Sequence, residues 1–372
     1  MKIGIMTYWW SDENYGQVLQ AYALQKYLRE VGHNPYLIRY FPPLDYRFSW
    51  VRRNLKFLKL FIPSSRKEYL ESCRLKKENK RRNIENFKKI YLKETKKRYS
   101  YRKLMKRPPC ADVYITGSDQ VWNTYSSGKK LTSDQKKFFH AFMLDFGASQ
   151  TKKISYAASW GRESISEEEA AECKPLLEKF SYISVREKAG VSICNRLGIQ
   201  AEVVVDPTLL FGPDDYRKLY SNAVNKQENS KYVLIYFRGA SNFDINKIYE
   251  WACAKKLKVQ FVPYNGYMSD KYELIYPSVE EWLYLIDNAE YVITDSFHCC
   301  LFSALFGKKY GVIKASDNFK ATNSRFDSLF DLMKSPSRFI SNEDYSKLEL
   351  EPTPYDRTNI LNYVPDLRRI LD

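Results

Sequence analysis

His298 stands where a predicted strand gives way to a predicted helix, a place where a side chain can do acid–base chemistry. Residues 291–294 form a short β-branched and aromatic run that predicts a buried strand. Asp295 and Ser296 can cap the helix that follows, and Gly307 can end it. The free N–H groups at such a helix start bind phosphate or carboxylate, and a histidine there can move a proton near neutral pH. The alternative is a core histidine that only bonds a backbone carbonyl.

The segments around this unit alternate between strand and helix patterns, which predicts an α/β fold. In residues 16–31, apolar side chains recur every three or four residues, as on the buried face of a helix. Residues 124–140 are expected to form a flexible excursion. The first series has predicted strands at 2–6, 35–40, 111–116, 153–157, 182–185 and 202–205, with further helices at 165–179 and 187–197. The second series has strands at 232–237 and 259–263, helices at 242–256 and 278–288, and the unit around His298.

Two such series predict two Rossmann-like doubly wound domains that face each other. We expect an N-terminal domain at 1–220, a C-terminal domain at 230–350 and a tail at 351–372. A last helix at 358–371 is expected to pack back on the first domain. The polar clusters of the chain follow predicted strands directly, and the carboxyl ends of parallel strands line the ligand crevice of an open sheet. The polar clusters are therefore the candidates for a site.

The positive charge of the chain is concentrated in one segment, an insertion at about residues 47–109. The whole chain has a formal net charge of +16, but Arg47 to Arg107 alone contain 23 Lys/Arg against five Asp/Glu. The segment also carries aromatic and aliphatic residues among good helix formers, which predicts two or three basic amphipathic helices. Peripheral contact of residues 47–107 with an anionic membrane is one expectation, and a solvated insertion is the other. Nucleic acid comes last, because no nucleic-acid-binding motif accompanies the charge.

The cysteines and histidines form no recognisable metal site. Seven cysteines, an odd number, contain no CxxC pair, which argues for a reducing cytoplasm and against a disulfide framework or structural zinc. Three scattered histidines and no clustered carboxylates lead us to expect no metal and no other cofactor. The longest apolar runs are too short to span a bilayer, and residues 1–6 resemble a strand rather than a secretion signal. We therefore expect a cytoplasmic protein.

Several short motifs, taken in order, resemble the polysaccharide pyruvyl transferase family across nearly the whole chain apart from the basic insertion. The residues that carry the resemblance are 14–24, 117–122, 155–159, 184–187, 205–208, 294–298 and 323–325. Their order and spacing are more specific than any one of them. One position departs from the family pattern. A small residue, usually glycine, commonly follows the motif histidine, whereas Cys299 and Cys300 follow His298 here.

The resemblance implies two Rossmann-like domains arranged as in a B-type glycosyltransferase, and a transfer reaction. The family's donor is phosphoenolpyruvate, whose enolpyruvyl carbon is transferred to sugar hydroxyls, usually leaving a cyclic pyruvate ketal and phosphate. Carried onto this sequence, the catalytic residues are His298, as the acid, and Arg186. A planar guanidinium suits bidentate contact with carboxylate or phosphate. The residues that correspond to donor-binding positions are Ser296, Phe297, Arg186, His298 and Arg325.

Candidates for the acceptor site lie on loops of the other half of the chain. They are Asn14, Tyr15, Gly16 and Asp119, and for Asn14 and Asp119 the alternative is loop capping. The acceptor is expected to be a lipid-linked or nucleotide-linked precursor of capsule, exopolysaccharide or another cell-surface glycan. A lipid-linked acceptor would place the protein at the inner face of the membrane. Two other functions stay open: a nucleotide-sugar-dependent glycosyltransferase of the same build, and a non-catalytic, membrane-associated binding protein.

Overall fold

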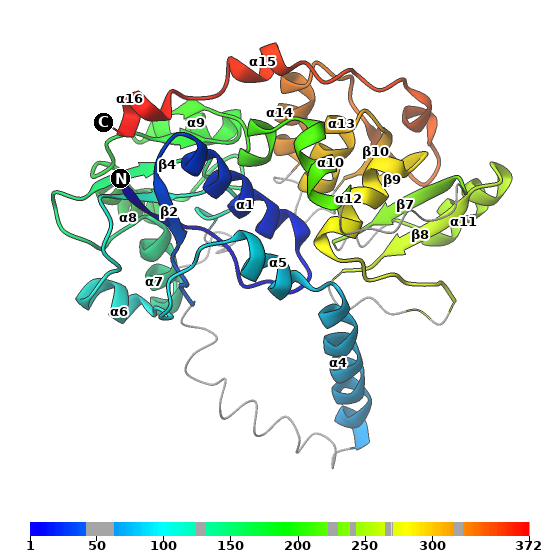
Figure 1. The fold of residues 1–372 in the computed structure, drawn as a ribbon, viewed down its shortest axis with the longest axis horizontal. Helices are drawn as coiled ribbons and strands as arrows, with labels where there is room; N and C mark the ends of the chain where they lie inside the picture. Colours follow the sequence, from blue (N-terminus) through cyan, green and yellow to red (C-terminus); the bar gives the residue numbers. More distant parts are fainter. Residues whose placement is uncertain are drawn as a thin grey trace.

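The two series of strands and helices form two open parallel β-sheets in the computed structural model (Figure 1). We call the part built on the strands up to residue 203 the first half, and the part built on the strands from residue 232 the second half. The structure describes residues 1–41, 63–123, 131–221, 230–238, 243–264, 269, 271–314 and 323–371, without the side chains of 63–69, 71 and 72.

The first sheet has the strand order β2-β1-β3-β4, with every neighbouring pair parallel. Its strands are β1 (Lys2–Met6), β2 (Asn34–Leu37), β3 (Val113–Thr116) and β4 (Lys152–Ser155). Beyond β4 lies the parallel pair of β5 (Ser184–Val185) and β6 (Glu202–Val203). An isolated bridge between Ala158 and Val185 joins this pair to the segment after β4. The six strands therefore act as one layer.

The second sheet has the strand order β11-β10-β9-β7-β8, and it is also parallel throughout. Its strands are β7 (Tyr232–Tyr236), β8 (Lys258–Val262), β9 (Tyr291–Thr294), β10 (Lys309–Ile313) and β11 (Phe339–Ile340). In each sheet the second strand is added on one side of the first strand, and the third strand is added on the other side. This change of side falls between β1 and β3 in the first sheet and between β7 and β9 in the second. Such a change of side opens a ligand crevice at the carboxyl ends of the two strands. The predicted α/β class with two doubly wound units is confirmed.

Helices cover both sheets, and several begin at a residue whose side chain caps them. In the first half they include α1 (Tyr15–Glu30), α8 (Glu167–Leu177), α9 (Lys188–Arg196) and α10 (Pro213–Ser221). In the second half they are α11 (Ile245–Ala254), α12 (Val279–Asn288), α13 (Phe297–Leu305) and α14 (Ser324–Leu332). Ser166 and Ser278 each form a capping box with the glutamate three residues later, which satisfies two N–H groups at the helix start. The sequence patterns predicted most of these helices but neither α10 nor α14.

The prediction of a flexible excursion at 124–140 is wrong for residues 131–140, which the structure describes. Helix α7 (Ser133–Phe142) begins with a capping box between Thr132 and Gln135. Its inner face buries Phe139 and Phe142 completely, so apolar packing orders a segment whose sequence pattern was weak. Residues 124–130 lie outside the described residues.

The two halves share one hydrophobic core across the seam between them, because buried residues of both belong to a single cluster. Tyr15 of α1 stacks on Trp282 of α12, with ring centroids 4.9 Å apart and an interplanar angle of 12°. Arg217 of α10 donates to both carboxylate oxygens of Asp287 of α12, at 2.7 and 3.0 Å. A bidentate pair constrains orientation as well as distance. Stacked rings and a charge pair thus join the halves.

The end of the chain returns along the first half (Figure 1). The N–H of Val205 donates to the carbonyl of Tyr363 at 3.1 Å, and Nζ of Lys152 donates to the carbonyl of Leu371 at 3.1 Å. The prediction of one continuous last helix is wrong. The segment forms two short helices, α15 (Arg357–Leu361) and α16 (Leu367–Leu371), with Pro365 between them. Proline lacks the N–H that a continuous helix would need there.

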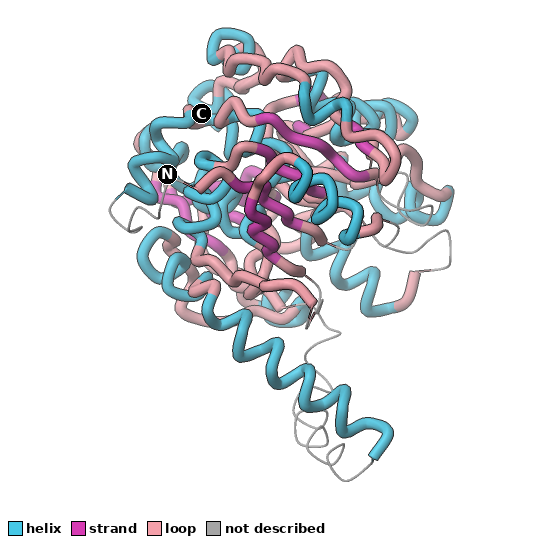
Figure 2. The backbone as a smooth tube through the Cα atoms, turned by 90° about the vertical axis from the view of Figure 1, so that its right-hand side faces the viewer, coloured by secondary structure: helices cyan, strands magenta, loops and turns pink. Residues whose placement is uncertain are grey.

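The described part of the basic insertion contains three helices: α4 (Pro63–Arg81), α5 (Ile84–Tyr91) and α6 (Tyr101–Lys106). Helix α4 projects from the body of the molecule, whereas α5 lies against it (Figures 1 and 2). Phe87 and Tyr91 of α5 meet Tyr22 of α1 edge-on, with ring centroids 5.7 and 5.6 Å away. Aromatic contacts therefore attach α5 to the first half. Within the described residues, no helix is long and apolar enough to cross a membrane. Three aromatic residues of the insertion, Trp50, Phe57 and Phe61, lie outside the described residues.

Candidate active site

Polar side chains from both crevices meet at the seam between the halves. The first half contributes Asp119 after β3, Arg186 after β5 and Asp206 after β6. The second half contributes Arg238 after β7, the start of α13 after β9, and Arg325 on α14. The topology thus brings to one place groups that lie more than two hundred residues apart in the sequence, such as Asp119 and Arg325.

His298 lies in the first turn of α13, as predicted. Oγ of Ser296 accepts from the N–H of Cys299 at 3.5 Å and so caps the helix, while the N–H of Ser296 donates to Oγ1 of Thr294 at 3.0 Å. The imidazole is buried against α1 of the other half. A Cβ atom on Gly16 would lie only 2.2 Å from Nδ1 of His298, so only glycine allows this approach without displacing the ring.

Asp206 is the residue that ties the site together. Its Oδ2 accepts from Nη1 of Arg186 at 3.0 Å and from Oγ of Ser118 at 2.8 Å. The same oxygen lies 3.5 Å from Nε2 of His298 across the seam. Its Oδ1 accepts from the N–H and from Oγ1 of Thr208, at 3.0 and 2.7 Å. One carboxylate therefore contacts three loops of the first half and faces the histidine of the second.

The same contacts keep Asp206 ionised. Complete burial on its own would raise the pKa of this carboxyl, but the neighbouring His298 and Arg186, with the N–H of Thr208, outweigh burial and hold the pKa well below its usual range. An ionised carboxylate facing one ring nitrogen is an arrangement that orients a histidine for proton transfer. The carboxylate of Asp206 therefore faces one ring nitrogen of His298 across the seam.

Arg186 is almost completely buried and only partly paired. Its side chain is 3% exposed, and its Nη1 is used by Asp206. Its Cζ lies 4.3 Å from the centroid of the Phe297 ring, so one guanidinium face is covered. Among the residues that the structure describes, Nε and Nη2 have no hydrogen-bond partner. Buried donors left unpaired destabilise a protein, and an anionic ligand would satisfy them.

Two more guanidinium groups approach from the second half. Cζ of Arg325 lies 5.8 Å from the Phe297 ring, and Nη2 of Arg238 donates to Oη of Tyr264 at 2.9 Å. Burial first, and then the charges of Arg186 and Arg238, lower the pKa of Arg325 to about 10, so it stays charged at neutral pH. Within the described part of the chain, Nε of Arg325 and Nε of Arg238 also have no partner. Three mutually repelling cations surround one small region.

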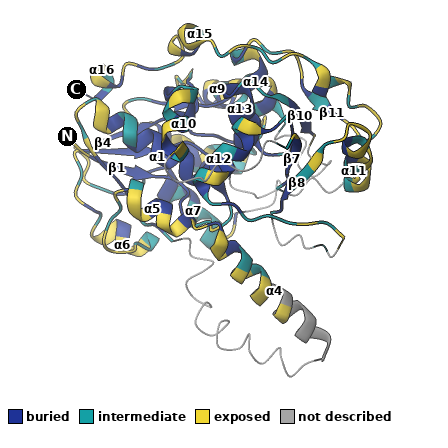
Figure 3. Ribbon diagram, turned by 45° about the vertical axis from the view of Figure 1, so that its right-hand side comes forward, coloured by how far each residue is buried: buried dark blue, intermediate teal, exposed yellow. Residues whose placement is uncertain are grey.

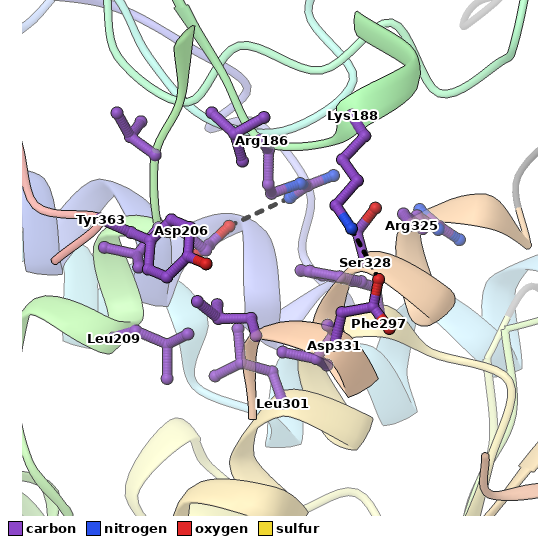
Figure 4. Close-up of a pocket in the computed structure, with 15 residues that line it drawn as sticks. Arg186, Lys188, Asp206, Leu209, Phe297, Leu301, Arg325, Ser328, Asp331 and Tyr363 are labelled. Atoms are coloured by element: carbon purple, nitrogen blue, oxygen red, sulfur yellow. Dashed lines mark hydrogen bonds and ion pairs between the residues drawn. The ribbon is translucent and has the colours of Figure 1, made fainter. Parts of the chain in front are cut away.

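An open cavity lies beside these groups, with about 530 Å³ of empty space including its mouth (Figure 4). Its polar lining includes Arg186, Asp206 and Arg325, and its apolar lining consists of valine and leucine side chains with the rings of Phe297 and Tyr363. Nζ of Lys188 pairs with Oδ2 of Asp331 at 2.8 Å, which links α9 of the first half to α14 of the second at this cavity. A small anion with an apolar part would match such a lining.

The four predicted acceptor residues have different surroundings in the structure. Oδ1 of Asn14 accepts from the N–H of Gln17 at 3.2 Å, which is the capping role named as its alternative. Tyr15 is fully buried, and its hydroxyl donates to the carbonyl of Pro277 at 2.7 Å. Gly16 faces His298, as described above. Asp119 has a left-handed φ of 79° and stabilises the charges of the nearby arginines of the second half.

Two residues of this cluster were not assigned from the sequence. Asp206 belongs to a motif used for the resemblance, but no role was given to it. Arg238 follows the strand β7 directly, which is the same signal that singled out Arg186. Position after a predicted strand could have identified both, whereas the distance across the seam could not be read from one sequence.

His140 and the adjacent cysteines Cys299 and Cys300 make contacts that fit a structural role. The ring nitrogens of His140 lie 2.9 Å from Oδ2 of Asp145 and 2.6 Å from Oε1 of Glu172, which joins α7 to α8. Cys299 and Cys300 are fully buried in α13, and burial raises the pKa of Cys299 to about 12, so the thiol stays protonated. Within the described ranges, no three His, Cys, Asp or Glu side chains are grouped as metal ligands would be.

Comparison with known proteins places the fold and the family. A family model described as "Polysaccharide pyruvyl transferase" matches residues 14–313. The UDP-GlcNAc 2-epimerase from Methanocaldococcus jannaschii is similar in structure, with a TM-score of 0.50 and 13% identity over 100% of this chain and 99% of that one. A structure of the same enzyme in complex with UDP-GlcNAc and UDP gives a TM-score of 0.50 and 14% identity over 100% and 99% of the two chains. Among proteins with curated descriptions, none matches in sequence.

At these identities the structural similarity shows a shared fold, the two-unit α/β build of B-type glycosyltransferases, and nothing finer. The family match carries more weight. It spans most of the chain and includes the motifs that hold Arg186, Asp206 and His298. The chain therefore belongs to the polysaccharide pyruvyl transferase family.

Proposed function

We propose that this transferase moves the pyruvyl group of phosphoenolpyruvate onto the hydroxyls of a sugar, in the synthesis of capsule, exopolysaccharide or a related cell-surface glycan. The observation that supports the donor is the set of buried guanidinium nitrogens of the candidate site that have no hydrogen-bond partner among the described residues: Nε and Nη2 of Arg186, Nε of Arg238 and Nε of Arg325. Phosphoenolpyruvate carries a carboxylate and a phosphate, so different arginines can each hold one anionic group. Binding would satisfy donors whose lack of a partner costs about 1–3 kcal/mol each.

In the proposed reaction, His298 gives a proton to the methylene carbon of the bound donor. The adjacent carbon becomes cationic, and a sugar hydroxyl attacks it while losing its proton to a base. Inorganic phosphate then leaves, and a second hydroxyl of the same sugar attacks the same carbon and loses its proton, which closes the ketal. Asp206 keeps the imidazole oriented, and the arginines stabilise the donor's charges throughout. Asp119 is the candidate to hold the acceptor.

Binding of the donor tests this function most directly. We expect phosphoenolpyruvate to raise the melting temperature and UDP-sugars to have no such effect, because the unpaired donors match a small polyanion. We also expect phosphate release in the presence of a matching lipid-linked or nucleotide-linked sugar, with chelator-treated protein as active as untreated protein. Stabilisation by UDP-sugars alone would instead indicate a nucleotide-sugar-dependent glycosyltransferase. Stabilisation by neither would favour a non-catalytic binding protein.

His298→Ala should lower turnover about a hundredfold or more, since general acid catalysis contributes on that scale. The measurement is phosphate release at saturating donor and acceptor. His33→Ala provides the matched control, because His33 lies in the turn before β2 and should leave turnover unchanged. Equal turnover in folded His298→Ala protein would remove this residue from the mechanism.

Arg186→Lys should weaken donor binding by about 1–3 kcal/mol, or roughly 5- to 150-fold in Kd. Lysine keeps the positive charge but lacks the planar fork that pairs with Asp206 and a ligand together. Titration of phosphoenolpyruvate by calorimetry measures the change, and Arg196→Lys, at the exposed end of α9, is the control. A change in acceptor affinity alone would show that Arg186 serves the other substrate.

We further propose that the basic insertion docks the enzyme on an anionic membrane that carries a lipid-linked acceptor. The described end of α4 exposes several cations on a helix that stands away from the body (Figure 3). Each Lys or Arg near such a surface contributes about 1 kcal/mol of attraction, which salt weakens. The exposed cations of this helix end are Arg74, Lys76, Lys77, Lys80 and Arg81.

Co-sedimentation with vesicles checks the docking proposal. We expect binding to vesicles that contain anionic lipid at low salt, with loss of binding at high salt. Vesicles of zwitterionic lipid alone should sediment without the protein. Binding that is independent of lipid charge, or no binding at any salt concentration, would leave the segment as a solvated insertion.

A further inference from the structure

The projecting helix α4 ends at a completely buried arginine. Arg82 follows the last residue of α4 and is 0% exposed. Its Nε donates to Oδ1 of Asn79 at 3.2 Å, its Nη1 donates to Oη of Tyr15 at 2.7 Å, and its Nη2 donates to the carbonyl of Pro263. Its Cζ also lies 5.3 Å from the Tyr15 ring and 5.1 Å from the Tyr276 ring. The three acceptors are uncharged.

These contacts join three separate parts of the molecule at one point. Asn79 belongs to the insertion, Tyr15 begins α1 of the first half, and Pro263 follows β8 of the second half. Tyr15 itself donates to the carbonyl of Pro277 and stacks on Trp282 of the second half. The base of α4 is therefore connected to both sides of the seam.

The same point lies close to His298, the candidate acid, because the residue after Tyr15 contacts the imidazole. Tyr15 is followed by Gly16, whose Cα faces the imidazole so closely that a Cβ would meet Nδ1 of His298 at 2.2 Å. The opposite ring nitrogen faces Asp206. The backbone at Tyr15 and Gly16 thus forms one of the two walls that hold the ring, and Arg82 holds that backbone through the Tyr15 hydroxyl.

We infer that Arg82 is a positioning residue for His298, and that through it the base of the basic helix α4 is mechanically coupled to the site. Burying a cation costs several kcal/mol, and without a carboxylate in direct contact that cost is recovered only in part by neutral acceptors. A methionine of similar length would fill the space at lower cost. What the guanidinium adds is three donors in a fixed plane, which set the insertion, α1 and the loop after β8 relative to one another.

The NMR signals of the His298 imidazole can test this inference. The chain has only three histidines, so long-range ¹H–¹⁵N spectra of the full-length protein can resolve each ring. In Arg82→Lys, which keeps the charge but not the plane, we expect the His298 ring signals to shift while those of His33 and His140 stay unchanged. Arg81→Lys is the matched control, since Arg81 is exposed, pairs with Glu78 of its own helix, and should move none of the three.

A second variant keeps the test decisive if Arg82→Lys fails to fold. Tyr15→Phe preserves the stack on Trp282 and removes the hydroxyl that accepts from Arg82 and donates to the carbonyl of Pro277. It should also shift the His298 signals. Unchanged His298 signals in either folded variant would overturn the inference, whatever happens to the melting temperature.

The effect on turnover rests on the proposed function of His298. We expect Arg82→Lys to lower kcat about tenfold, within the range that small misplacements of a catalytic group produce, with KM for phosphoenolpyruvate changed less than twofold. A loss expressed in KM alone would assign Arg82 to donor binding and contradict positioning. Should phosphoenolpyruvate prove not to be a substrate, the histidine spectra would still decide the inference, so the two failures are distinguishable.

Discussion

One buried, ionised carboxylate sets the geometry of the candidate site. Asp206 needs hydrogen-bond donors on both oxygens, because removing a carboxylate from water costs several kcal/mol unless it is paired. Thr208 supplies donors from the turn after β6, while Ser118 and Arg186 supply them from the loops after β3 and β5. The ends of three strands are therefore held to one side chain. His298 then faces the same carboxylate from the other half.

The three arginines add a second constraint, because their positive charges repel one another, whereas Asp206 attracts the groups around it. Arg186 comes from the first half, and Arg238 and Arg325 come from the second, so their repulsion acts across the seam. The lowered pKa of Arg325 records that repulsion together with burial. Other contacts nevertheless hold the seam, such as the stack of Tyr15 on Trp282 and the ion pair of Arg217 with Asp287. Part of the binding free energy of an anion would therefore appear as cohesion between the halves, in addition to affinity for the ligand.

The sequence allowed the local parts of this site to be predicted, because local signals determine them. The strand, cap and helix around His298 are encoded within seventeen residues, and Gly307 ends the unit with the expected positive φ of 64°. The position of Arg186 after a strand was likewise visible. Pro365, by contrast, was a local signal that the prediction of a continuous last helix failed to use.

Other features depend on partners far away in the chain. Tyr15 was taken for an acceptor contact, yet its ring and hydroxyl are used by Trp282, Pro277 and Arg82. Nothing near Tyr15 in the sequence distinguishes a side chain that points into a seam from one that points to a ligand. Helix α7 similarly forms because its phenylalanines are buried, and the composition of this segment alone did not reveal that burial.

The return of the tail to the first half has a consequence for the order of synthesis. Tyr363 lines the cavity beside Arg186, and its carbonyl accepts from Val205, the residue before Asp206. On the ribosome, residues 357–371 emerge after every strand of both sheets has been made. The second sheet can therefore complete its pairing first, while the first half still lacks its last cover. The wall next to the central carboxylate is thus set in place only after the strands of both sheets have been made.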